Sequence, residues 1–116
     1  MSLQSRRIED DRFHDTELCY TLTLISGRYK PIILYCLMEY EPVRFNQMRR
    51  YIPQISDRTL SLNLKEMEKD EHIIRTPYPQ LPPRVEYSLT DLGRSLAVTL
   101  YALCDWGVEN RPVDRY

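Results

Sequence analysis

The sequence predicts a mostly helical fold of the α+β class, and three observations lead to that class. Apolar residues recur at helical spacing over several stretches of the 116-residue chain. Segments 72–78 and 84–89 have the composition of strands, and the second alternates Val85, Tyr87 and Leu89 with polar residues. Between them lie three prolines in five residues, which cannot continue a ladder of strand hydrogen bonds. The two strands are therefore expected to form a hairpin with a stiff, projecting tip.

The N-terminal part is expected to supply an arm and a first helix. Residues 1–15 are polar and of mixed charge, which is typical of an arm or a loosely held helix. Apolar residues at helical spacing predict a helix over 16–25, and Gly27 follows where a helix C-cap is expected.

A second helix is predicted over residues 31–39. Pro31 suits its first turn, because proline lacks the N–H that the first turn leaves unpaired. The segment is apolar nearly all round and is therefore expected to be the central core helix, with Cys36 as a small buried hydrophobe. A turn at Glu41 and Pro42 then leads to a short strand at 43–44.

The stretch from 44 to 70 predicts a short helix, a tight turn and a longer helix. Met48 lies at helical spacing from apolar neighbours on one face of a helix over 46–51, which Pro53 ends. Ser56 has the character of an N-cap for a helix over 56–70. On that helix one face is apolar (Leu60, Leu64, Met67), the opposite face carries Arg58, Leu62, Lys65 and Lys69, and Ser61 lies at the margin.

This division is typical of a helix-turn-helix, in which one helix face is held by the core and the other is presented to a groove of DNA. Followed by the hairpin, it predicts a winged helix-turn-helix. Charge agrees with that prediction: residues 44–65 hold five basic residues against one acid, whereas the whole chain carries a net charge of −1. Two structural alternatives stay open, namely an ordinary helical hairpin with solvated charges and an edge hairpin that serves stability only.

A final helix is predicted over 90–110, with Thr90 as its N-cap and residues 111–116 as a tail. Apolar side chains cover more than half of its circumference, which is wider than one core contact uses. A second copy of the same helix is the economical partner for the surplus, so we expect a homodimer in which the two recognition helices meet successive turns of major groove. The interface residues expected on this helix are Leu100, Tyr101, Cys104 and Val108.

Other features exclude several classes of protein. At 116 residues the chain forms one domain, 16–110, with no apolar run long enough to cross a bilayer and no signal peptide, so the cytoplasm is the expected location. Three scattered cysteines and two isolated histidines argue against a structural zinc or a disulfide framework. No glycine loop or nucleophile–base grouping indicates catalysis, so we expect neither an enzyme nor a bound cofactor or metal.

The motifs ISGRYK, RFNQMRR, PPRVEYSLT, LGRSL and CDWG, taken in this order, resemble those of the HxlR-type transcriptional regulators, winged-helix proteins related in shape to the MarR group. The resemblance covers about residues 16–108. It implies a dimeric bacterial repressor or activator that binds a palindromic operator in double-stranded DNA and dimerises through its terminal helices.

Carried onto this sequence, the resemblance implies a set of DNA-facing residues. Arg58 is expected to pair with a guanine edge, Thr59 to help the helix cap, Arg44 and Arg49 to contact phosphate, and Arg84 to serve the wing at 79–84 on the adjacent minor groove or backbone. The full set is Arg44, Arg49, Ser56, Asp57, Arg58, Thr59, Ser61, Leu62, Lys65 and Arg84.

The sequence departs from the resembled family at two places. Leu62 and Asn63 stand where members often have two glutamines, so contact at Leu62 would be apolar, against a thymine methyl. The Cys-Pro pair by which some members sense oxidants or electrophiles falls on Thr16 and Glu17, which leaves Cys19, three residues later, as a candidate thiol sensor. A different functional class also stays open: a winged-helix module that binds proteins and not DNA, favoured by the near-neutral charge of the chain.

Overall fold

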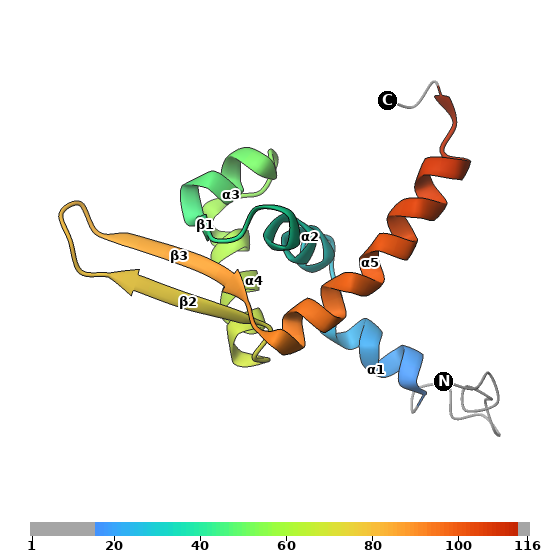
Figure 1. Ribbon diagram of the computed structural model, residues 1–116, viewed down its shortest axis with the longest axis horizontal. Coiled ribbons are helices and arrows are strands. Elements are labelled where there is room, and N and C mark those ends of the chain that lie inside the picture. The colour runs from blue at the N-terminus through green and yellow to red at the C-terminus, as the bar shows by residue number, and fades with distance from the viewer. Residues whose placement is uncertain (1–15, 114–116) are drawn as a thin grey trace.

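The computed structural model describes residues 16–113, and in this range it confirms a mostly helical winged fold (Figure 1). The predicted arm at 1–15 and the last three residues of the tail lie outside the described residues. The elements are α1 (Glu17–Leu24), α2 (Lys30–Tyr40), β1 (Val43–Arg44), α3 (Phe45–Tyr51), α4 (Asp57–Lys69), β2 (Ile73–Tyr78), β3 (Arg84–Leu89) and α5 (Asp91–Asn110). Each lies within one or two residues of the position that the sequence predicts.

The three strands form one antiparallel sheet in the order β1-β3-β2. β2 and β3 pair over their whole length, from Ile73 opposite Leu89 to Tyr78 opposite Arg84. The short β1 pairs with the inner part of β3, where Arg44 lies opposite Glu86. The outer part of the hairpin therefore projects from the body as a wing, as Figure 1 shows.

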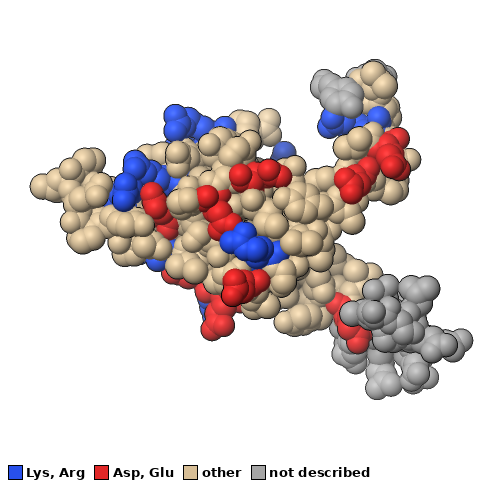
Figure 2. Space-filling view, in the orientation of Figure 1, with Lys and Arg blue, Asp and Glu red and all other residues tan. Residues whose placement is uncertain are grey.

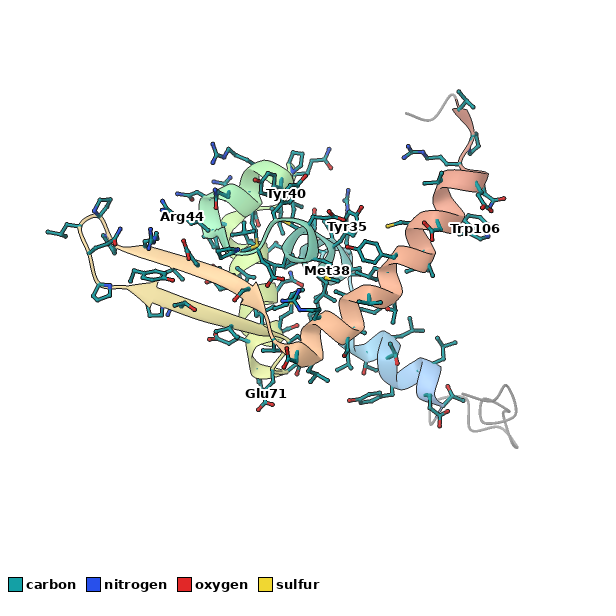
Figure 3. All side chains as sticks on the ribbon, viewed as in Figure 1. Tyr35, Met38, Tyr40, Arg44, Glu71 and Trp106 are labelled. Carbon is teal, nitrogen blue, oxygen red and sulfur yellow. The ribbon has the colours of Figure 1, made fainter. Side chains whose placement is uncertain are left out.

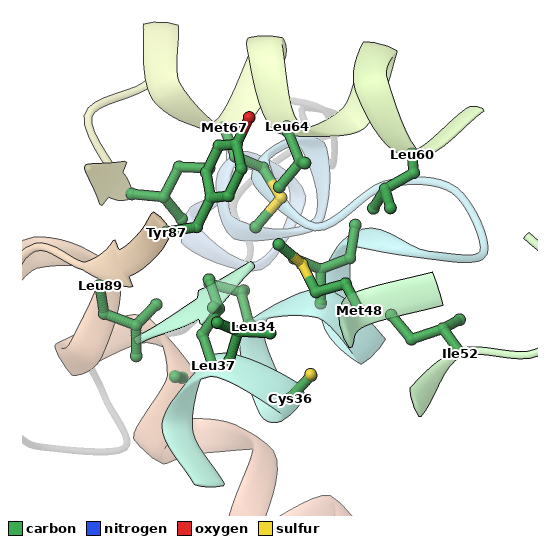
Figure 4. Close-up of a cluster of buried hydrophobic side chains, with 14 of the residues drawn as sticks. Leu34, Cys36, Leu37, Met48, Ile52, Leu60, Leu64, Met67, Tyr87 and Leu89 are labelled. Carbon is green, nitrogen blue, oxygen red and sulfur yellow. The ribbon is translucent and has the colours of Figure 1, made fainter. Parts of the chain in front are cut away.

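The core lies where α2, α3 and α4 meet the inner half of the sheet (Figure 4). α2 contributes Ile33, Leu34 and Leu37, each at most 1% exposed, and Cys36 is buried beside them as predicted. Among the larger side chains, Val43, Met48, Leu60 and Met67 are also fully buried. Closely packed aliphatic side chains of this kind supply most of the free energy of folding in a small domain.

α2 is the central core helix, as its sequence predicts, but its apolar side chains are not all buried. Ile32 is 41% exposed and Tyr35 is 39% exposed, so one flank of the helix faces outward between α1 and α5. The expected C-cap at Gly27 is also displaced: α1 ends at Leu24 with Ile25 as its C-cap, and Gly27 lies two residues further on with a φ of 84°. His72, which is polar and isolated in the sequence, is buried at the start of β2.

α5 divides into two halves with different surroundings. Its first half packs through Gly93, Ala97 and Leu100, which are its buried residues, and Thr90 caps it by accepting a hydrogen bond from the Gly93 N–H. Its second half extends away from the body, with Leu103 64% exposed and Trp106 68% exposed (Figure 1). Leu100 is therefore packed in the core of its own chain and is not available at a surface, in contrast to its predicted place in a dimer interface.

Glu41 links three elements. Its carboxylate accepts a hydrogen bond from the Leu89 N–H at 3.0 Å and forms an ion pair with Arg94 of α5. Burial by itself would raise the pKa of Glu41, but the hydrogen bonds from Arg94 and the Leu89 N–H, together with the charge of Arg94, hold that pKa below its ordinary value. The turn after α2 is thereby joined to both β3 and α5.

None of the helices in the described range is long and apolar enough to cross a bilayer.

Replacement of Gly93 by alanine is expected to lower the free energy of unfolding by about 1–3 kcal/mol. A Cβ at this position would lie 1.9 Å from the carbonyl oxygen of His72, and neither backbone can move without disturbing the junction of β2 and α5. Urea unfolding followed by circular dichroism measures the difference.

Gly107→Ala is the matched control, because a Cβ there meets no atom within 4 Å of the described chain. Alanine in the middle of a helix is favoured over glycine by up to about 1 kcal/mol, so this variant should be as stable as the wild type or more so. Equal stability of Gly93→Ala and the wild type would contradict the close approach of α5 to His72.

Candidate nucleic-acid interface

The start of α4 is built around Ser56. The Ser56 hydroxyl oxygen accepts a hydrogen bond from the Thr59 N–H at 3.1 Å and lies 2.9 Å from the Thr59 hydroxyl. Asp57 occupies the first turn, where the helix dipole favours an acid. The predicted capping roles of Ser56 and Thr59 are thus confirmed, and both side chains are partly committed to the helix end.

α4 has the two faces that its sequence predicts. Leu60, Leu64 and Met67 are at most 2% exposed and hold the helix against the core. On the other side Arg58 and Lys65 are exposed, Ser61 is half-buried, and Leu62 leaves half of its surface (51%) uncovered. A half-exposed leucine between two cations makes this outer face amphipathic.

The turn between α3 and α4 is held by residues of the segment that connects α1 and α2. Gln54 adopts a φ of 98°, a left-handed conformation that is uncommon for a residue other than glycine. Arg28 donates a hydrogen bond to the Gln54 side-chain oxygen and the Tyr29 hydroxyl donates one to the Gln54 carbonyl, both at 3.3 Å. Ile55 is buried next to it. The angle between α3 and α4 therefore depends on the α1–α2 turn.

An ion pair spans the same turn. Nε of Arg49, near the end of α3, lies 2.8 Å from Oδ1 of Asp57 at the start of α4. Both side chains are largely exposed, so the pair contributes little to stability. It does neutralise Asp57, an acid that would otherwise face the same way as the cations around it. Part of the Arg49 charge, predicted to contact phosphate, is used in this pair.

A second ion pair, which the sequence reasoning missed, connects α4 to α2. Nζ of the buried Lys30 lies 2.6 Å from Oε2 of Glu66, and the Lys30 ammonium holds the pKa of Glu66 below its usual range. A buried ammonium without such a partner is costly. Lys30 therefore fixes the position of α4 along α2. Little in the sequence indicates that Lys30 is buried and paired, because a lysine before Pro31 suggests only a solvated helix start.

The charged Arg84 of the wing stands at the outer end of β3, directly after the tip loop, and not in the tip itself. The Arg84 guanidinium lies 4.2 Å from the centre of the Tyr78 ring, and its Nε is 3.6 Å from Oε2 of Glu86. Arg84 is therefore held against the hairpin by residues of β2 and β3. The tip, residues 79–83, is uncharged, and its Leu81 is 96% exposed. Figure 2 shows the same contrast: the end of the wing is free of blue and red.

The cations of the helix-turn-helix are not neutralised within the described residues, apart from Arg49. No ion pair joins the side chains of Arg44, Arg50, Arg58 or Lys65 to an acid in the range 16–113. Arg44 lies at the end of α3 that faces the wing (Figure 3). The acids of this region gather instead at the far end of α4: Glu66, Glu68, Asp70 and Glu71.

The cysteines are free thiols in the described structure. Burial raises the pKa of Cys36 to about 11, which makes it unreactive. Cys104 lies half-buried beside Tyr35 and, together with Glu39, raises the pKa of that phenol above its ordinary value. Cys19 lies half-buried on α1, and its role as a thiol sensor stays a prediction. Within residues 16–113 no three His, Cys, Asp or Glu side chains are grouped to hold a metal.

The fold and the basic outer face of α4 define a winged helix-turn-helix protein. The chain belongs to the HxlR-like helix-turn-helix family, whose model matches residues 24–115. An uncharacterised HTH-type transcriptional regulator of Halalkalibacterium halodurans is 45% identical to it over 111 residues, which cover 96% of this chain and 98% of that relative. YdeP of Bacillus subtilis, also an HTH-type transcriptional regulator, is 43% identical over 97 residues, 84% of this chain and 75% of YdeP.

Solved structures agree with this assignment. The redox regulator HypR in its reduced form is 40% identical and superposes with a TM-score of 0.79, over 87% of this chain and 100% of HypR. Its oxidised form gives a TM-score of 0.77 at 42% identity, over 83% of this chain and 98% of HypR. Membership makes the chain a transcriptional regulator of the helix-turn-helix type and not an enzyme, as its sequence predicts.

Removal of the Glu66 carboxylate is expected to destabilise the protein, because Lys30 would stay buried without its partner. Glu66→Ala should lower the urea midpoint, whereas Glu68→Ala, at an exposed position of the same helix with no side-chain partner in the described range, should leave it unchanged. A Glu66→Ala midpoint equal to that of Glu68→Ala would show that Lys30 does not hold α4.

Proposed function

We propose that the protein binds a pseudo-palindromic operator in double-stranded DNA as a homodimer and represses or activates transcription from it. The N-terminal half of α4 enters the major groove. The wing at 79–84 lies along the adjacent minor groove or backbone. Such a regulator works in the cytoplasm, where it reaches the DNA.

The observation that best supports this proposal is on α4: opposite its buried stripe, the helix has a basic face that does not take part in packing. Three of its outward residues, Arg58, Leu62 and Lys65, have no function in folding that the structure reveals. They lie in the first three turns after the Ser56 cap, and the start of a recognition helix is the part that meets base edges. Apart from Asp57, which Arg49 neutralises, the acids of α4 lie at its other end and would point away from the phosphates.

The residues of this face differ in what they can recognise. The Arg58 guanidinium can donate two hydrogen bonds to one guanine edge, and Leu62 offers apolar contact to a thymine methyl. Ser56, Ser61 and Lys65 supply shorter or more flexible donors. Arg44 and Arg49 suit phosphates, which position the protein without reading sequence.

The dimer is supported by the second half of α5. Leu103 and Trp106, with Val108 79% exposed, form an apolar surface on a helix segment that has no buried residue in the described chain. α1 adds exposed apolar residues of its own, among them Leu18 at 67%. Figure 3 shows Trp106 on the part of α5 that extends past the body. A surface of this kind marks an association site, and a two-fold pairing would place two copies of α4 on half-sites roughly 34–36 Å apart.

The direct test is fluorescence anisotropy with the DNA that flanks the gene of this protein, against a scrambled duplex, over a series of salt concentrations. We expect tight binding to the flanking DNA, with an affinity that rises as the salt concentration falls. Absence of binding to any duplex at low salt would contradict the proposal and favour the alternative, a winged-helix module that binds proteins.

Two arginines should give different signatures on that DNA. Arg58→Ala should lose discrimination at one base position, worth roughly 1–3 kcal/mol, whereas Arg49→Ala should weaken all duplexes alike and reduce the salt slope by about one. Binding to a set of single-base variants at several salt concentrations separates the two effects. Wild-type affinity of both variants would show that this face of α4 does not contact DNA.

Disruption of the apolar surface on α5 should separate the subunits. Leu103→Asp buries a charge in the proposed interface, so sedimentation velocity should show a monomer, and DNA affinity should fall about 100-fold or more as bivalency is lost. Val98→Asp, an exposed apolar position in the first half of α5, is the matched control and should remain a dimer. A monomeric wild type would overturn the dimer, and a dimeric Leu103→Asp would place its interface elsewhere.

A further inference from the structure

A pocket of about 580 Å³ lies between α3 and the outer part of the wing, where the tip loop meets β3. One wall is formed by Arg44 and by four residues of α3, namely Phe45, Asn46, Gln47 and Arg50; the other wall includes Pro82 and Arg84. Figure 1 shows the arrangement that produces it, with α3 and the β2–β3 wing diverging from β1. No acidic residue lines the pocket in the described structure.

The three arginines come from different elements, and the fold brings them together. Arg44 ends β1, Arg50 lies one turn further along α3 than Asn46, and Arg84 begins β3. Only the last of them has an acid within ion-pair distance in the described range: its Nε is 3.6 Å from the Glu86 carboxylate, beyond hydrogen-bond length. The Arg44 and Arg50 guanidiniums are exposed and have no acidic partner among residues 16–113.

Three guanidiniums around one pocket repel each other unless an anion lies between them. A phosphate group matches this arrangement, because guanidinium forks bind its oxygens in pairs and the charge-assisted bonds are strong. Asn46 supplies a further amide on the same wall. The Gln47 side-chain oxygen is already engaged with the Arg44 N–H at 2.8 Å, which keeps the backbone around Arg44 in place.

We infer that this pocket binds one phosphate of the DNA backbone, and that Arg50, absent from the residues predicted to contact DNA, is a principal ligand. The inference rests on the proposed function. In that proposal α4 occupies a major groove and the wing reaches the next minor groove, and the inference places the backbone strand that separates the two grooves against α3 and the wing. The pocket opens in this position, and its arginines anchor the strand there.

The experiment uses the full chain and the duplex that it binds most tightly, made with single neutral methylphosphonate linkages at successive positions. At one position per half-site the neutral linkage should weaken wild-type binding about tenfold. Arg50→Gln should bind the unmodified duplex about tenfold more weakly, show a salt slope smaller by about one, and lose no further affinity at that linkage. Arg50→Lys, which keeps the charge, should restore the salt slope.

Arg75→Gln is the matched control, since it removes one exposed arginine from β2 that lines a different pocket, beside Ser61 and Lys65. This variant should keep the tenfold effect of the neutral linkage. Thermal unfolding of both variants should match the wild type, because neither side chain has a partner in the described range.

The outcomes separate this inference from the function on which it rests. If the wild type binds no duplex, the proposed function fails. If the wild type binds with a salt dependence but every neutral linkage affects Arg50→Gln and the wild type equally, the pocket inference alone is overturned. Inorganic phosphate at matched ionic strength tests a free anion as the occupant: saturable binding that Arg50→Gln abolishes, without any linkage coupled to Arg50, would overturn the assignment to DNA.

Discussion

The structure depends on how the recognition helix α4 is held. Its buried stripe, Leu60, Leu64 and Met67, packs into a core centred on α2, and this contact turns the opposite face outward. Packing alone lets a helix slide or rotate by small steps. The Lys30–Glu66 pair adds a fixed point at one end, and the Ser56 cap with the Arg49–Asp57 pair adds one at the other. Side chains that contact base edges must be positioned to within a fraction of an ångström. The contacts at the two ends of α4 fix the helix that carries them.

Features that are local in sequence could be predicted from the sequence. Caps at Ser56 and Thr90, the helix end before Pro53 and the buried stripe of α4 all follow from interactions within one or two turns. Alternation in 84–89 likewise predicted β3 and its pairing with the neighbouring strand. The two faces of α4 came from the same local periodicity, whereas the candidate DNA-contact set was what the family resemblance implied.

Features that depend on tertiary contacts could not be predicted. Leu100 occupies the same apolar surface of α5 as Tyr101 and Leu103, and only the position of α2 decides which of them is buried. Arg50 has the same local surroundings as Arg49, yet one pairs with Asp57 across the turn and the other lines a pocket with Arg84, which lies 34 positions further along the chain. The excess of basic residues in this stretch predicted that Arg49 and Arg50 both lie on a basic surface. It could not predict that they have different partners.

α2 connects the two proposed interaction surfaces, which are the outer face of α4 and the second half of α5. Ala97 and Leu100 fasten the first half of α5 within the core that α2 centres, and Lys30 at the start of α2 holds α4. Tyr35, on the exposed flank of α2, meets Tyr101 edge to face at 6.2 Å where α5 begins to leave the body. A change in the angle of α5 would therefore act on α2 and, through a close-packed core that does not deform smoothly, on α4. In the proposed dimer two copies of α4 would have to match two half-sites at once, so a small rotation of α5 would be enough to alter DNA affinity.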